Sequence, residues 1–211
     1  MQQELLPLFP LQMVLFPRTP TALHIFEDRY KEMMGESIER NTEFGVVLAG
    51  EKGIVNTGCT AFVDKVTEKY PDGRLDIIVV GRRRFELLDL DDSRPYLRAA
   101  VEFFDDDGME EPMPEGLREK VLEQYQELLK LGDTSALLDP ELTDAQISFQ
   151  LAQVIADLNQ RQLLLMSRSE TDRMHQLGEY FPNLLRERRE LSRARQSAST
   201  NGHGKRPAGL P

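Results

Sequence analysis

The sequence predicts an α+β protein, with a mostly antiparallel sheet or small barrel carrying one helix, followed by an α-helical bundle. Turn-forming and β-branched residues dominate up to about residue 105, whereas apolar residues recur every three or four positions from about 113 to 195. Six or so short strands with a single helix do not form a βαβ series, so a parallel sheet is disfavoured. At 211 residues, the chain is long enough to bury a substantial core.

The boundary between these halves is an acidic stretch, residues 105–114, with the sequence DDDGMEEPMP. Glycine and proline punctuate it, and its side chains are too polar to pack, so we expect an exposed connector. The expected organisation is therefore a β-rich part over 1–108 and a helical part over 109–196. Residues 197–211 have almost nothing to bury and are expected to form a disordered tail.

The β-rich half contains short strand-forming runs separated by turns. The clearest is a hairpin around Pro71-Asp72-Gly73, joining a strand that includes residues 61–63 to a strand beginning at Leu75. Gly81 interrupts that second strand and predicts a bulge or bend before it resumes over 82–87. Further strands are expected over 4–9, 21–26, 43–49 and 96–104.

One helix is expected among these strands, over residues 28–40. Its apolar stripe consists of Tyr30, Met33, Met34 and Ile38. Acidic residues in the first turn suit the positive end of the helix dipole.

The helical half shows four apolar stripes. They predict helices over 116–131, over 143–158 after the capping box Thr143–Gln146, over 160–166, and from the capping box Ser169–Asp172 to about residue 195. Gly132-Asp133 is expected to end the first of these helices. Pro182 lies inside the last stripe and predicts a kink at 178–182.

Composition excludes several classes of protein. A formal net charge of −10 argues against nucleic acid and anionic membranes as main partners. A single cysteine, Cys59, excludes an intramolecular disulfide and a cysteine-rich metal site. The sequence has neither a signal-peptide pattern nor an uninterrupted apolar run of about 18 residues. We therefore expect no membrane partner and a cytoplasmic location.

No motif indicates an enzyme, a cofactor or a metal. Residues 45–53 (GVVLAGEKG) loosely resemble a phosphate loop, but Glu51 stands where the lysine belongs, so a buried strand ending in a turn is favoured. The histidines, His24, His175 and His203, are far apart and lack metal-ligand spacing. Cys59 is expected to be buried as a small hydrophobic residue. Paired carboxylates lie at helix starts and turns, where capping or solvation explains them.

The basic run Arg82-Arg83-Arg84 is the concentrated basic patch of the sequence before its C-terminal helix. On a strand, Arg82 and Arg84 would lie on one side and Arg83 on the other. We favour pairing of these arginines with nearby acids over a nucleic-acid platform. The arginines from Arg186 to Arg195 complement the C-terminus of the last helix.

Several segments resemble one known family. They are Leu6–Leu11 (LPLFPL), Val14–Pro17 (VLFP), His24–Tyr30 (HIFEDRY), Gly58–Ala61 (GCTA), Gly81–Phe85 (GRRRF) and Leu151–Leu158 (LAQVIADL). With the hairpin and the later helices, their order and spacing over residues 4–195 are similar to those of the Lon protease N-terminal, substrate-binding domain family. The resemblance implies a PUA-like β-barrel followed by a helical bundle, without the ATPase and protease modules of a full Lon protease.

The resemblance also implies a non-catalytic domain that binds unfolded or extended polypeptide segments. Such a domain would be an adaptor or chaperone-like element of protein quality control, with a separate ATPase or protease as a further partner. We expect polar peptide contacts beside the first helix, at Glu27, Asp28, Arg29 and Lys31. The alternative is an RNA-binding PUA-like module that uses Arg82–Arg84, which the net charge opposes. A hydrolase is the third reading and would require a pocket with Ser or Cys beside a histidine.

Overall fold

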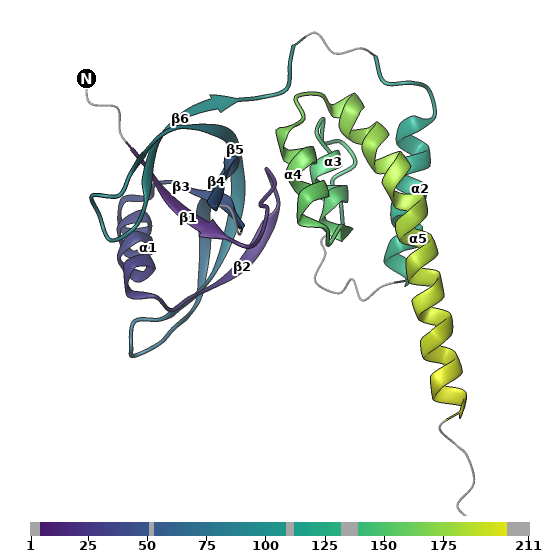
Figure 1. Ribbon diagram of the computed structural model, residues 1–211, viewed down its shortest axis with the longest axis horizontal. Helices are drawn as coiled ribbons and strands as arrows, with labels where there is room; N and C mark the ends of the chain where they lie inside the picture. Colours follow the sequence, from purple (N-terminus) through teal and green to yellow (C-terminus); the bar gives the residue numbers. More distant parts are fainter. Residues whose placement is uncertain (1–4, 51–52, 109–111, 132–138, 202–211) are drawn as a thin grey trace, which may run out of the picture.

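The computed structural model describes residues 5–50, 53–108, 112–131 and 139–201, with side chains described as far as residue 194. The expected α+β architecture is confirmed. A strand-rich part with one helix comes first, and the C-terminal helices lie beside it (Figure 1).

Six strands form one mixed sheet that nearly closes on itself. They are β1 (Leu6–Leu11), β2 (Pro20–Ile25), β3 (Phe44–Gly50), β4 (Gly53–Lys69), β5 (Leu75–Asp91) and β6 (Arg98–Phe104). The order is β2-β5-β4-β3-β1-β6, and β5 also pairs with β6. That additional pairing closes a five-stranded ring and leaves β2 attached along the first half of β5. The pairings are antiparallel except for β1 with β3.

The predicted hairpin is confirmed, with longer strands than expected. Gly73, with φ 85°, closes the turn by donating its N–H to the carbonyl of Tyr70. The register of β4 and β5 shifts opposite the segment 81–84, which confirms the bulge predicted at Gly81. A Cβ on Gly81 would lie 2.0 Å from the carbonyl oxygen of Phe16, so this position also requires glycine for close backbone approach.

Helix α1 (Asp28–Arg40) has the predicted bounds and lies beside the barrel (Figure 1). Tyr30, Met33 and Met34 are buried as expected, and the Tyr30 ring lies 4.4 Å from that of Phe9. Ile38 is 38% exposed, so the predicted stripe was wrong at its last member.

The C-terminal helices are α2 (Leu117–Leu131), α3 (Ser148–Leu151) with a 3-10 turn over Ala152–Val154, α4 (Leu158–Met166) and α5 (Glu170–Asn201). The prediction of one helix over residues 143–158 was wrong. Asp144 accepts the N–H of Gln146 in a turn, and only the short α3 follows, so the predicted capping box is not formed. At the second predicted box, Ser169 Oγ accepts the N–H of Asp172 at the start of α5.

Helix α5 packs along α2 and continues past its end (Figure 1). The helix continues without interruption through Pro182 as far as Asn201. It therefore extends beyond residue 197, where we expected a disordered tail to begin. The predicted stop at Gly132-Asp133 lies outside the described residues. No helix in the described part of the chain is long and apolar enough to span a membrane.

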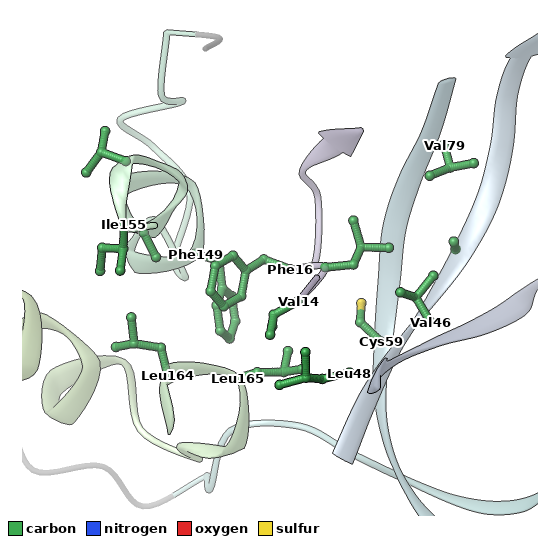
Figure 2. Close-up of a cluster of buried hydrophobic side chains, with 14 of the residues drawn as sticks. Val14, Phe16, Val46, Leu48, Cys59, Val79, Phe149, Ile155, Leu164 and Leu165 are labelled. Atoms are coloured by element: carbon green, nitrogen blue, oxygen red, sulfur yellow. The ribbon is translucent and has the colours of Figure 1, made fainter. Parts of the chain in front are cut away.

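The segment between β1 and β2 joins the barrel to the helices. Val14, Leu15 and Phe16 are at most 2% exposed, although they belong to no strand or helix. The ring of Phe16 stacks on that of Phe149 in α3, with centroids 5.6 Å apart (Figure 2). One cluster of buried side chains therefore includes residues of the barrel and of all the C-terminal helices.

Candidate functional site

Strand β2 is an edge strand. In the described part of the chain it pairs with β5 and with no other strand. Gly81 donates its N–H to the carbonyl of Thr19, and the register then continues as Thr21 opposite Val79. In an antiparallel ladder, hydrogen-bonded pairs alternate with non-hydrogen-bonded pairs. The N–H and C=O groups of Ala22 and His24 therefore point away from β5. These backbone groups form an exposed sheet edge.

The end of β2 carries an exposed group of aromatic rings. Phe26 is 60% exposed, and the His24 ring stacks on it with centroids 5.9 Å apart. His24 also makes a T-shaped contact with the ring of Tyr70, with centroids 6.1 Å apart. The exposed edge therefore ends beside rings that offer contact area to an apolar side chain.

Asp76 holds this aromatic group in place. His24 Nδ1 lies 2.5 Å from Asp76 Oδ1, and the Tyr70 hydroxyl donates to Asp76 Oδ2 at 2.7 Å. The hydrogen bonds with His24 and Tyr70 lower the pKa of the Asp76 carboxyl, and the Asp76 hydrogen bond raises the pKa of Tyr70. His24 and Asp76 face each other across the β2–β5 ladder.

The four residues expected to contact peptide lie immediately after β2, at the start of α1. They form two local ion pairs, Glu27 with Arg29 at 2.8 Å and Asp28 with Lys31 at 3.0 Å. Lys31 also donates to the carbonyl of Asp72 in the hairpin turn. Glu27 occupies the N-cap position without a side-chain capping bond, so capping does not account for its carboxylate.

A concave surface, which we call the junction cleft, lies where the barrel meets the helices. Its volume is about 340 Å³, and its walls include Pro17, Arg18, Arg82, Arg83, Phe103 and Gln146. Arg18 has a left-handed backbone, with φ 56°, which is uncommon for a residue with a side chain. Its guanidinium group donates to Asp144 and Gln146, each at 2.9 Å.

The three arginines of the basic run have different environments. Arg83 pairs with Glu43 at 3.0 Å, and Arg84 is 2% exposed and pairs with Asp106 at 2.6 Å. Arg82 is exposed and has no ion-pair partner among the described residues. The expected pairing with acids is therefore confirmed for two of the three. The expectation that Arg82 and Arg84 share a side was wrong, because the bulge in this part of β5 breaks the alternation.

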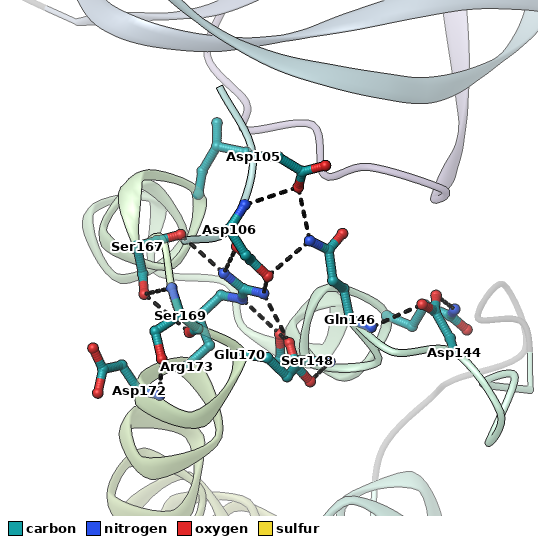
Figure 3. Close-up of polar contacts among 12 residues, drawn as sticks. Asp105, Asp106, Asp144, Gln146, Ser148, Ser167, Ser169, Glu170, Asp172 and Arg173 are labelled. Atoms are coloured by element: carbon teal, nitrogen blue, oxygen red, sulfur yellow. Dashed lines mark hydrogen bonds and ion pairs between the residues drawn. The ribbon is translucent and has the colours of Figure 1, made fainter. Parts of the chain in front are cut away.

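Asp106 is the centre of a buried polar network that joins the barrel to the helices. Arg173 is 0% exposed, and its two terminal nitrogens donate to the two carboxylate oxygens of Asp106 at 2.7 and 2.6 Å (Figure 3). Arg84 reaches the same carboxylate from β5. The predicted exposed connector was therefore wrong at Asp106, because two buried guanidinium groups compensate the cost of burying its charge.

The pKa values of Asp106 and Glu170, two acids of this network, shift in opposite directions. Burial alone would raise the pKa of Asp106, but hydrogen bonds and the charges of Arg173 and Arg84 outweigh burial and hold that pKa below its usual value. Burial dominates at Glu170 and raises its pKa, although Ser148 and Arg173 both donate to its carboxylate. The network therefore joins β5, the segment after β6 and the C-terminal helices, and Arg84 and Gln146 of the network also line the cleft.

The remaining candidates for chemistry do not converge. His175 is exposed on α5, His24 lies on β2, and His203 is outside the described residues. The described residues contain no cluster of three or more metal-ligating side chains. In the loosely matching phosphate loop, the first residues form β3, and Glu51 and Lys52 are outside the described part. Neither the junction cleft nor a second cleft beside Ser37 and Ile38 combines a nucleophile with a histidine.

Cys59 is fully buried, as expected, and burial raises the pKa of its thiol from 9 to about 12. At pH 8 the thiolate fraction falls about a thousandfold, because each pKa unit is a tenfold change. We expect the native protein to react with a thiol reagent such as dithionitrobenzoate no faster than it unfolds, and to react at once in guanidinium chloride. Stoichiometric labelling of the native protein within seconds would contradict this burial.

The free edge of β2 and the junction cleft are the surfaces that sequence reasoning missed. The bounds of β2 were predicted to within a residue, but its position at the edge depends on β5 pairing with both β4 and β6. Phe26 was a usable signal of an exposed binding surface. It is a large aromatic residue immediately before Glu27 and Asp28, and such charged neighbours make it difficult to bury. The sequence showed only one part of the cleft, the basic run Arg82–Arg84, because the other walls come from distant segments such as those that contain Pro17 and Gln146.

Comparison with known proteins gives a consistent picture. Lon protease of Parabacteroides distasonis is 30% identical over 112 residues, covering 49% of this chain and 14% of that protein. Lon protease 2 of Herpetosiphon aurantiacus is 27% identical over 164 residues, covering 72% of this chain and 19% of that protein. The chain therefore spans less than a fifth of the length of these two relatives.

Two solved structures share the fold. The crystal structure of a Lon N-terminal domain protein from Xanthomonas campestris superposes with a TM-score of 0.66 at 23% identity, covering 84% of this chain and 98% of that one. The N-terminal domain of Lon protease from the Mycobacterium avium complex gives a TM-score of 0.59 at 14% identity, covering 85% and 98%. The family described as the ATP-dependent protease La (LON) substrate-binding domain matches residues 5–181. Since that match covers most of the 211 residues, this chain belongs to the Lon substrate-binding domain family.

Proposed function

We propose that this chain is a non-catalytic domain that binds unfolded or extended polypeptide segments, as an adaptor or chaperone-like element of protein quality control. Membership of a family named for substrate binding supports this role. The observation that carries the proposal is the exposed edge of β2, which ends beside the exposed ring of Phe26.

The proposed mode of binding is addition of a strand to β2. An extended segment pairs its backbone with the outward N–H and C=O groups of Ala22 and His24, and backbone pairing tolerates many sequences. An apolar side chain of the segment packs on Phe26 and His24. The ion pairs of Glu27 with Arg29 and of Asp28 with Lys31 supply polar contacts at the end of the strand.

Replacing Ala22 with Pro tests this mode. Proline removes one outward N–H and is tolerated on an edge strand whose N–H faces solvent. One lost hydrogen bond is worth about 0.5–1.5 kcal/mol, so we expect affinity for a fluorescently labelled unfolded casein to fall by about twofold to twelvefold. Fluorescence anisotropy measures the affinity, and the midpoint of thermal unfolding verifies the fold.

The matched control is Ala22→Val, which enlarges the side chain at the same position and keeps the N–H. It should bind casein as the unchanged protein does. Hydrogen exchange offers a direct measurement, since bound casein should protect the amides of Ala22 and His24. Absence of casein binding at tens of micromolar would refute the proposed function, and equal affinity of the proline and valine variants would refute the β2 edge as its site.

A further inference from the structure

The junction cleft lies at the N-terminal end of the β2 edge. Pro17 and Arg18 form part of its wall, and β2 begins two residues later at Pro20. Two residues span at most about 7 Å. The N–H of Arg18 donates to the carbonyl of Gly81, so the start of β2 and the arginine run of β5 are held together at this point.

Within the described part of the chain, one guanidinium group of the cleft, that of Arg82, has no carboxylate partner. Arg18 pairs with Asp144 and Arg83 pairs with Glu43, so both are compensated and fixed in direction. Arg82 is exposed, its guanidinium carbon lies 5.8 Å from the centroid of the Phe62 ring, and it forms no ion pair within the described residues. In a protein of net charge −10, an uncompensated cation in a concave site favours an anionic group of a ligand.

The cleft is also lined by an exposed aromatic ring, that of Phe103. Phe103 is 42% exposed, and the guanidinium carbon of Arg83 lies 3.8 Å from its ring centroid. An apolar side chain next to a bound anion would therefore contact Phe103 while the anion faces Arg82.

The direction of strand addition places a chain end at this cleft. A segment that adds antiparallel to β2 runs with its C-terminus toward the N-terminal end of β2. Building on the proposed function, we propose that the junction cleft binds the C-terminal carboxylate of the extended polypeptide, with Arg82 as its cationic partner. The domain then recognises the end of an unfolded chain in addition to its backbone.

The charge balance favours one carboxylate over a polyphosphate. Asp105 also borders the cleft with an 84% exposed side chain, and Glu43 and Asp144 accompany the neighbouring arginines. A stretch of phosphates would meet these carboxylates, whereas a single carboxylate needs only Arg82. The cleft is therefore less suited to RNA than to a single carboxylate.

The test compares two labelled unfolded peptides of the same apolar sequence, one with a free C-terminal carboxylate and one amidated. We expect the free acid to bind about fivefold to tenfold more tightly. Arg82→Gln should remove this difference and leave the affinity for the amidated peptide unchanged. Arg193→Gln, the same charge change at an exposed position of α5, should preserve the difference.

The outcomes separate this inference from the function on which it rests. Binding of both peptides with equal affinity refutes the carboxylate site and leaves strand addition intact, whereas binding of neither refutes both. An amidated peptide ending in Glu that binds as tightly as the free acid overturns the assignment to the chain terminus. Tighter binding of a uridine oligonucleotide than of the free acid, lost in Arg82→Gln and falling steeply with salt, overturns it in favour of a polyphosphate.

Discussion

Replacing Asp106 with Ala is expected to lower the free energy of unfolding by about 3–5 kcal/mol, because it removes the carboxylate that two buried guanidinium groups share. Arg84 and Arg173 are 2% and 0% exposed, and both donate to Asp106 at 2.6 Å. Urea denaturation followed by circular dichroism measures the change.

Asp107→Ala is the matched control for this prediction. Asp107 is the next residue and is exposed, so its replacement should change the unfolding free energy by less than about 0.5 kcal/mol. Equal losses in the two variants would contradict the network. The Asp106 contribution also depends on pH. Because its pKa in the folded state is lowered, the stabilisation is present above the ordinary Asp pKa and is lost as the pH falls through the lowered value.

The second large effect is expected at Phe16. Phe16→Ala should cost about 3–5 kcal/mol, since truncating a buried phenylalanine loses its burial and leaves a cavity. The Phe16 side chain is 0% exposed and stacks on Phe149 across the boundary between barrel and helices (Figure 2). Thermal and urea unfolding should both show the loss.

Phe26→Ala is the matched control, because Phe26 is 60% exposed and lies outside the core. It should leave the unfolding free energy nearly unchanged and weaken binding of unfolded casein. Phe16→Ala and Phe26→Ala therefore separate the residue that holds the two parts together from a residue of the proposed binding edge. Similar losses of stability in both variants would refute this division.

The pairing of β5 with β2 and β6 along the same side explains why the proposed binding edge was missed. Residues 75–91 form one strand whose first half pairs with β2 and whose second half pairs with β6. The alternating pattern predicts that a strand exists, but it carries no information about which strand remains at an edge. The residues after the edge, Glu27, Asp28, Arg29 and Lys31, were selected from sequence, and their role in binding stays a prediction.

The prediction that the connector over residues 105–114 is exposed was wrong at Asp106 for a related reason. Three successive aspartates predict a solvated segment when they are considered alone. In the structure, Asp106 is largely buried because Arg84 and Arg173, respectively 22 residues before and 67 residues after it in the sequence, reach the same carboxylate. No local pattern records that convergence.

By itself the sequence determined the α+β class, the hairpin, the bounds of α1 and α2, the burial of Cys59 and the family. Apart from the family, these features depend on local periodicity and turn chemistry, which act over a few residues. Only the tertiary structure decided which strand is an edge, which arginine of the basic run forms no ion pair with the described residues, and which aspartate is buried. Those properties depend on contacts between residues far apart in the chain, because packing and the desolvation of charge are set by neighbours in space.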